Sequence, residues 1–253
     1  MLLAHVLSTD RAWLAAHGDA TLNADQAKSF DALARRRRDG VPIAYLTGRR
    51  EFYGLELEIT PDVLIPRPES EILVEFALAH VGEGEAACVL DLGSGSGAVA
   101  LAIAKARPAS SVLGADVSHA ACALARGNAA RLHIDNAKFI ASDWFERVPP
   151  VAFDVIVANP PYVADGDPHL GQDDLRFEPA IALKGGIDGL DAMRRIIAGA
   201  SGYLKQDAWI AIEHGYDQAD RVQALLCAAG FDELNTRRDL AGILRTTSAR
   251  RPA

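Results

Sequence analysis

The chain has 253 residues, of which 49% are apolar and 24% charged, which is typical of a globular protein. Its formal net charge is −8, whereas proteins that hold duplex nucleic acid usually present a basic surface to the phosphates. No apolar run reaches the roughly 20 residues that cross a bilayer, and the first residues do not resemble a secretory signal. We therefore expect a cytoplasmic protein without membrane association or stable nucleic acid binding.

A metal site is not predicted. The three cysteines, Cys88, Cys122 and Cys227, lie far apart, and the seven histidines have no ligand spacing. We expect the thiols to be buried or idle.

The first 47 residues are predicted to be helical, because their apolar residues recur every three to four positions. Asn23 is one of several capping candidates before the longest helix. Arg35–Arg38 fall at the end of that helix, where they suit its negative dipole end, so we interpret them as a solvated terminus. Residues Phe52–Thr60 alternate around Gly54, which indicates a small hairpin.

After the hairpin the pattern alternates between helices and strands. Helices are predicted at Glu69–His80, Ala98–Arg107, Ala120–Leu132 and Leu190–Leu204, and strands at Ala87–Leu92, Val112–Asp116, Lys138–Ala141, Phe153–Ala158 and Ala208–Glu213. This alternation predicts an α/β fold with a mostly parallel sheet covered on both faces. Ligands of such sheets bind at the carboxyl ends of the strands.

A glycine-rich loop joins the first strand of this sheet to its helix, and it contains Asp91, Gly93, Ser94, Gly95, Ser96 and Gly97. Asp116 ends the next strand, where a carboxylate can accept hydrogen bonds from both hydroxyls of a ribose. Two cofactors compete for this pattern. A nicotinamide enzyme prefers G-x-G-x-x-G and tolerates the alanine present at position 98, whereas an S-adenosylmethionine enzyme prefers an acidic residue before G-x-G-x-G.

Asp143 and Trp144 follow the third strand, where an adenine ring would lie. Asp143 can accept a hydrogen bond from the adenine amino group, and Trp144 can cover the ring. A core position is an equally good interpretation of Trp144.

The most informative segment is Asn159-Pro160-Pro161-Tyr162, directly after an apolar strand. Neither proline has an N–H to donate, and a residue before proline avoids helical geometry, so a stiff extended turn is expected. Asn159 Oδ1 and the Pro160 carbonyl could each accept one N–H of a planar amide nitrogen, while Tyr162 packs on its flat face. Taken alone, the segment is also consistent with a simple rigid loop.

In combination these motifs resemble the PrmC (HemK) family, which methylates the glutamine of the Gly-Gly-Gln motif in class I release factors. The resemblance runs through nearly the whole chain and includes Pro42–Gly48, Ile65–Glu71, Arg176–Pro179, Gly185–Leu190, Glu213–Gly215 and Asp239–Gly242. Two positions depart from the family pattern. Ser70 replaces the usual threonine, and after Gly242, where the family commonly has an Asp-Arg pair, Leu244 precedes Arg245.

The resemblance implies a Rossmann-like methyltransferase that uses S-adenosyl-L-methionine, releases S-adenosyl-L-homocysteine and supports translation termination. It also implies three parts: a helical substrate-docking domain (1–48), a hairpin and linker (49–68) and a catalytic domain (69–253). Asn159, Pro160 and Tyr162 would be catalytic, and Pro161 would join them in binding the substrate. The roles of Arg67, Glu69, Glu71 and Glu213 stay open, and a monomer is expected.

Three alternatives are weighed against this interpretation. The first is a methyltransferase that modifies an exocyclic amino group of DNA or RNA, which would need to receive a base and bind a phosphate backbone. The second is a glutamine methyltransferase that acts on a ribosomal protein. The third is a nicotinamide oxidoreductase or a non-catalytic nucleotide-binding module, neither of which gives the Asn-Pro-Pro-Tyr segment a purpose.

Overall fold

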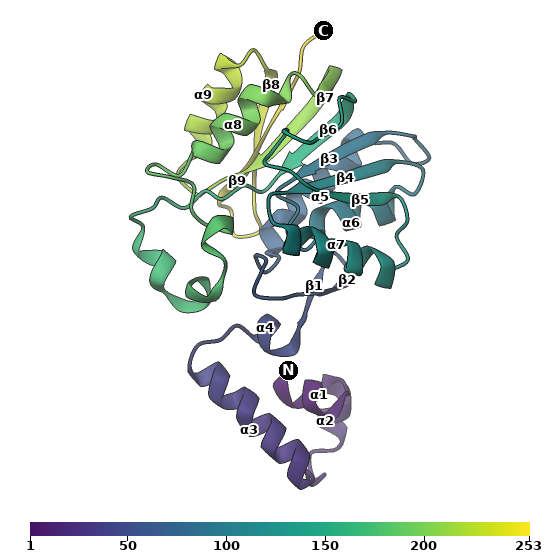
Figure 1. Cartoon of the computed structure of the whole chain (residues 1–253), viewed down its shortest axis with the longest axis vertical. Coiled ribbons are helices and arrows are strands. Elements are labelled where there is room, and N and C mark those ends of the chain that lie inside the picture. The colour runs from purple at the N-terminus through teal and green to yellow at the C-terminus, as the bar shows by residue number, and fades with distance from the viewer.

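The structure is a computed structural model, and it describes residues 1–253 apart from the side chain of Asp173. Four helices form the N-terminal part: α1 (Leu2–Leu7), α2 (Arg11–Ala16), α3 (Ala24–Arg38) and α4 (Ile43–Thr47). The first three lie apart from the sheet, and α4 leads toward it (Figure 1). The predicted helical character of residues 1–47 is therefore confirmed.

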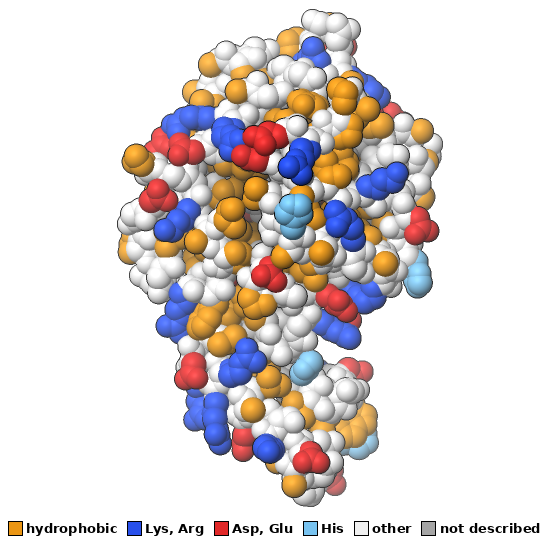
Figure 2. Space-filling view, viewed as in Figure 1, with side chains coloured by type: hydrophobic (Ala, Val, Ile, Leu, Met, Phe, Trp, Pro, Cys, Tyr) orange, Lys and Arg blue, Asp and Glu red, His pale blue; other side chains and the backbone are white. Residues whose placement is uncertain are grey.

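Helix α3 begins with a capping box. Asn23 Oδ1 accepts a hydrogen bond from Gln26 N at 2.9 Å, and the Gln26 side chain accepts one from Asn23 N at 3.0 Å. Its last turn carries Arg35–Arg38, all exposed, and these cations gather at the upper end of α3 in Figure 2. One of them does more than face solvent, because Arg37 forms an ion pair with Asp174 at 3.0 Å.

The hairpin consists of β1 (Arg49–Phe52) and β2 (Leu55–Glu58), which are joined by a turn at Tyr53 and Gly54. The predicted start at Phe52 was wrong by three residues, because Arg49 already pairs with Glu58. The inward side chains of β2 are buried in the same core cluster as helices that pack on the main sheet. The hairpin is thus anchored to the sheet domain rather than free.

The main sheet has seven strands in the order β5-β4-β3-β6-β7-β9-β8, of which the first five are parallel. The strands are β3 (Cys88–Leu92), β4 (Ser111–Asp116), β5 (Ala137–Ala141), β6 (Phe153–Ala158), β7 (Leu204–Glu213), β8 (Asp232–Arg238) and β9 (Leu244–Arg250). The helices are α5 (Glu71–His80), α6 (Ala98–Ala106), α7 (His119–Arg131), α8 (Asp191–Ala200) and α9 (Ala219–Ala228), with short 3-10 turns η1 (Pro68–Ser70), η2 (Pro168–Gly171), η3 (Asp173–Phe177) and η4 (Ala180–Ala182). The predicted α/β architecture is confirmed.

Two apolar clusters, one on each face, hold this sheet between its helices. Val89 and Val155 point into a cluster with α5, α6 and α7, whereas Leu90 and Ile156 point into a second cluster with α8 and α9. Because successive strand side chains face opposite ways, a strand buried on both faces must be largely apolar, as β3 and β6 are apart from Asp91 and Asp154. Figure 1 shows the two groups of helices on opposite sides of the sheet.

The C-terminal third departs most from the predicted elements. Helix α8 ends at Ala200 instead of Leu204, because Gly202 lies in a turn and Leu204 already belongs to β7, opposite Phe153. Helix α9 and strands β8 and β9 were not among the predicted elements. Within the described residues, no helix has the length and apolar character needed to cross a membrane.

Candidate active site

The site lies where the strand order of the sheet reverses, between β3 and β6. These strands are parallel neighbours in which Leu92 pairs with Ala158, so Gly93 and Asn159 leave the sheet side by side. A Cβ atom built on Gly93 would lie 3.4 Å from the Asn159 carbonyl oxygen. This is the crevice in which doubly wound sheets bind their ligands.

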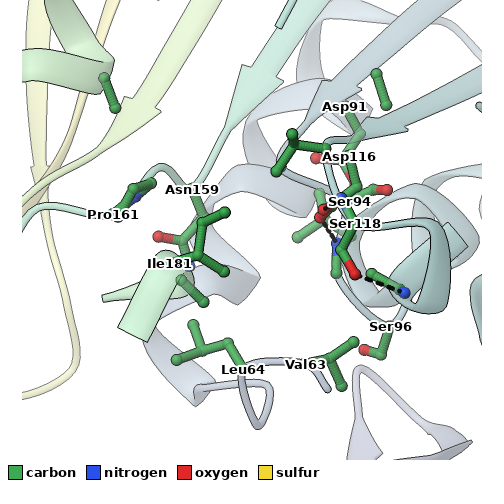
Figure 3. A pocket seen from close by; sticks show the side chains of 18 of the residues that line it. Val63, Leu64, Asp91, Ser94, Ser96, Asp116, Ser118, Asn159, Pro161 and Ile181 are labelled. Atoms are coloured by element: carbon green, nitrogen blue, oxygen red, sulfur yellow. Dashed lines mark hydrogen bonds between the residues drawn. The ribbon is translucent and has the colours of Figure 1, made fainter. Parts of the chain in front are cut away.

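A cavity of about 400 Å³ opens at this point, within the range of small-molecule sites. Figure 3 shows Asp91, Asp116 and Ser94 on one side of it, with Asn159 and Ile181 on the other. The residues predicted from sequence that line this cavity are Asp91, Gly93, Ser94, Gly95, Ser96, Asp116, Asp143, Trp144, Asn159 and Pro161, together with Arg67.

The glycine-rich loop takes a backbone conformation that favours glycine. Gly93, Gly95 and Gly97 have φ angles of +76°, +52° and +84°. A Cβ on Gly97 would also lie 3.0–3.1 Å from side-chain atoms of the core, whereas one on Gly95 would meet nothing within 4 Å. Gly97 itself does not line the cavity among the described residues, so its part is to close the loop against the core.

Two carboxylates, buried Asp91 and half-buried Asp116, hold this loop in place. Asp91 Oδ2 accepts a hydrogen bond from Ala100 N at 3.1 Å, and Asp116 Oδ2 accepts one from Gly95 N at 2.9 Å. Burial raises the pKa of Asp91 to about 7, and burial also raises the pKa of Asp116 against two backbone N–H donors. Each carboxylate oxygen can accept a further hydrogen bond from a ligand, since it has two lone pairs.

Asp143 and Trp144 line the next part of the wall, after β5. Asp143 forms an ion pair at 2.9 Å with Arg195 of α8, which also lines the cavity, and this pair joins the loop to α8. Trp144 has a φ of +49° and packs partly against the second core cluster. The structure thus combines the two interpretations of Trp144, a cavity wall and a core contact.

Only part of the Asn159–Tyr162 turn faces the cavity. Asn159 and Pro161 line the cavity, whereas Pro160 is buried and Tyr162 packs against the second core cluster. Among the described residues that line the cavity, neither Pro160 nor Tyr162 appears. Burial raises the pKa of the Tyr162 hydroxyl, with nearby Glu213 adding to this effect. The role of Tyr162 in setting a substrate plane stays a prediction.

One segment outside the predicted site, residues 183–190, supports this turn. Val163 N donates to Leu183 O and Gly185 N donates to Val163 O, so the chain after the turn is pinned to the glycine segment. A Cβ on Gly189 would lie 2.4 Å from Tyr162 O, and one on Gly185 would lie 2.7 Å from Pro161 O. The repeated glycines of Gly185–Leu190 are the signal that could have revealed this contact from sequence.

A buried carboxylate joins the linker before α5 to the loop that follows the turn. Glu178 accepts a hydrogen bond from Ile65 N at 3.0 Å and forms an ion pair with Arg67. Arg67 is therefore both a cavity residue and one partner of a structural ion pair. The roles of Glu69 and Glu71 were also left open from the sequence, and neither residue takes part in this ion pair. Glu71 accepts a hydrogen bond from Tyr53 N, and the charge of Glu69 raises the pKa of Glu213.

Two protein-family models match parts of the chain. Residues 1–48 match the PrmC N-terminal domain, and residues 69–173 match the methyltransferase small domain. Among curated proteins, a release factor glutamine methyltransferase of Burkholderia pseudomallei is 49% identical over 100% of this chain and 90% of its own length. Those of Xylella fastidiosa and Bordetella pertussis are 47% and 50% identical, over 99% and 97% of this chain and 91% of their own lengths.

Solved structures share the fold at low sequence identity. A methyltransferase from Pyrococcus furiosus superposes with a TM-score of 0.60 at 18% identity, covering 88% of this chain and 98% of its own. A 16S rRNA methyltransferase of Thermus thermophilus, in complex with AdoMet and guanosine, has a TM-score of 0.60 at 20% identity over 80% and 49% of the two chains. These similarities establish a methyltransferase fold.

Proposed function

The chain belongs to the family of release factor glutamine methyltransferases, and we propose that it methylates the glutamine of the Gly-Gly-Gln motif in class I peptide-chain release factors. The methyl group would come from S-adenosyl-L-methionine and would go to the side-chain amide nitrogen, N5. The observation that carries this proposal is the carboxamide of Asn159, which shares one cavity with the glycine-rich loop.

The cavity suits an adenosine-bearing methyl donor. Ser94 Oγ is buried at the cavity without a hydrogen-bond partner in the described part of the chain, and the space over Gly95 is open. Asp116 would bind the ribose hydroxyls, Asp143 the adenine amino group, and Trp144 would cover the ring. When bound, S-adenosylmethionine supplies a methyl group on a positively charged sulfur, which makes that carbon electrophilic.

The difficulty of the reaction lies in the acceptor, because the lone pair of an amide nitrogen is delocalised into its carbonyl. Asn159 Oδ1 and the Pro160 carbonyl would each accept one N–H of the substrate amide and so favour positive charge on its nitrogen. Fixed dipoles aimed at developing charge are effective because they need no rearrangement during the reaction. They would also hold the nitrogen in line with the methyl carbon. The methylated nitrogen is acidic and can lose its proton to water, so no dedicated general base is required.

Partner and location follow from the same proposal. Release factors act during translation, so the enzyme would work in the cytoplasm, and we propose a monomer. The net charge of −8 favours a protein acceptor over an acceptor on a long phosphate backbone.

Transfer of labelled methyl groups to three acceptors tests this function. Purified release factor should be labelled, whereas a Gly-Gly-Ala variant of its motif and DNA or RNA should not. Label on nucleic acid but not on the factor would overturn the proposal in favour of an exocyclic amino group as acceptor. Label on a ribosomal protein with none on the factor would overturn the choice of substrate but not the chemistry.

A further inference from the structure

The carboxamide of Asn159 is held by a chain of two buried side chains, of which the first, Ser70, lines the same cavity as Asn159. Asn159 Nδ2 donates a hydrogen bond to Ser70 Oγ at 2.9 Å, and Ser70 Oγ lies 2.6 Å from Glu213 Oε2. Ser70 is 4% exposed and Glu213 only 1%. The three residues come from distant parts of the sequence, and the sheet brings two of them together because Ala158 of β6 pairs with Ile212 of β7.

The polarity of this chain of hydrogen bonds follows from elementary chemistry. An ionised carboxylate can only accept, and a serine hydroxyl has a single hydrogen to donate. Ser70 must therefore donate to an ionised Glu213 and accept from Asn159. Only the nitrogen of the Asn159 carboxamide can donate, so Nδ2 faces Ser70 and Oδ1 is left for the cavity that Asn159 lines.

We propose that Ser70 and Glu213 are positioning residues that fix the Asn159 carboxamide with its Oδ1 toward the substrate amide. This inference rests on the proposed function of Asn159. A neutral Glu213 would allow the opposite arrangement, in which the acid donates to Ser70 and Ser70 donates to Asn159 Oδ1. Asn159 Nδ2 would then face the N–H groups of the substrate amide. Both groups are hydrogen-bond donors, so no hydrogen bond could form between them.

The charge of Glu213 is set by the groups around it. Burial raises its pKa to about 7, and Glu69 of η1 adds to this effect. Hydrogen bonds from Ser70 and Tyr162 lower the pKa, as does Arg245 of β9. The adjacent His214 is buried, which lowers its pKa, and its Nε2 lies 2.9 Å from Thr247 Oγ1. Turnover should therefore rise as the pH passes through about 7 and Glu213 ionises.

The test uses the full-length protein, S-adenosylmethionine and purified release factor, with kcat and KM measured from pH 5.5 to 9. Ser70→Ala should lower kcat roughly tenfold to hundredfold with little change in the KM for S-adenosylmethionine. The substitution misplaces the Asn159 carboxamide that accepts from the substrate amide, but it leaves the contacts to the cofactor in place. Ser70→Thr keeps the hydroxyl and should restore kcat. Glu213→Gln should lower kcat and remove its rise near pH 7.

Ser110→Ala is the matched control, since it deletes another buried hydroxyl that donates to Glu85 O at 2.7 Å, just before β4 and away from the site. Calorimetric binding of S-adenosylmethionine shows that each variant is folded. Ionisation of Asp91, which holds the cofactor loop, would appear in the cofactor KM rather than in kcat.

Wild-type kcat in both Ser70→Ala and Glu213→Gln, with the rise near pH 7 unchanged, would overturn the inference and leave the proposed function standing. A Ser70→Thr variant as slow as Ser70→Ala would also overturn it. A wild-type protein that methylates no release factor would overturn the proposed function and this inference with it.

Discussion

At the residue scale, the proposed reaction depends on Asn159 as an acceptor of hydrogen bonds at the carboxyl end of β6. Its position follows from local sequence, because an apolar strand and two prolines fix where the turn begins. Its orientation does not, because it depends on Ser70 and Glu213, which lie 89 and 54 residues away in the chain. The sequence therefore predicted the position of Asn159, but it could not predict which residues orient its side chain.

Asn159→Ala should lower methyl transfer by about a hundredfold or more, because it removes one of two fixed acceptors. Binding of S-adenosylmethionine should stay within a few-fold of wild type, since the ribose and adenine contacts are untouched. Single-turnover rates and calorimetric titration measure the two effects separately. Wild-type transfer rates in this variant would exclude the proposed mechanism.

Asp91→Asn should alter how stability depends on pH. Because burial raises the pKa of Asp91 from 3.8 to about 7, the folded protein binds this proton more tightly than the unfolded chain. Its contribution is therefore full below about pH 4 and is lost as the pH rises through 7. Asparagine cannot ionise and can still accept from Ala100 N, so the variant should lose less stability than wild type between pH 5 and pH 8.

Urea denaturation at the two pH values measures this difference, and Asp135→Asn, at an exposed position, is the control. The same loss of stability in the Asp91→Asn variant as in wild type would contradict the assignment of a buried proton-binding carboxyl.

At the element scale, the Asn159–Tyr162 turn is shaped by a glycine segment, Gly185–Gly189, that packs directly on its backbone. The central strands and their helices were predictable because each shows a local apolar pattern. Strand β8 was not, because its sequence (Asp232–Arg238) is largely polar and it lies at the sheet edge. The 3-10 turns between residues 168 and 182 were missed for a related reason, since contacts with the linker and α3 hold them rather than any periodicity of their own.

Gly189→Ala tests the glycine packing. Gly189 and Gly230 have similar φ angles, +75° and +85°, but a Cβ on Gly189 would lie 2.4 Å from Tyr162 O while one on Gly230 would meet nothing within 4 Å. Both alanine variants should lose about 1–2 kcal/mol from the backbone conformation. Only Gly189→Ala should also displace the turn and lower kcat. Equal losses of kcat in the two variants would show that the contact does not shape the site.

At the scale of the whole molecule, two ion pairs join the N-terminal half to the loop over the site. Arg37 pairs with Asp174 where both side chains are more than 40% exposed, whereas the Glu178 side chain that pairs with Arg67 is fully buried. Exposed ion pairs contribute about 1 kcal/mol or less, but removing one partner of a buried pair costs several kcal/mol. Such ties join segments more than 100 residues apart, so no local pattern could predict them.

Glu178→Ala should therefore lower the free energy of unfolding by about 3 kcal/mol, since Ile65 N and Arg67 both lose their acceptor. Arg37→Ala, the matched control at the exposed tie, should lower it by about 1 kcal/mol or less. Denaturant unfolding monitored by tryptophan fluorescence compares the two variants. A loss in Arg37→Ala as large as that in Glu178→Ala would mean that the exposed tie is as important as the buried one.

A crystal structure of the protein with S-adenosyl-L-homocysteine and a Gly-Gly-Gln peptide from a release factor would show directly whether Asn159 and Pro160 accept hydrogen bonds from the substrate amide. We predict that the glutamine amide nitrogen lies about 2.7–3.2 Å from both Asn159 Oδ1 and the Pro160 carbonyl oxygen, in line with the sulfur. A glutamine bound elsewhere, or one that faces Asn159 Nδ2, would contradict the account.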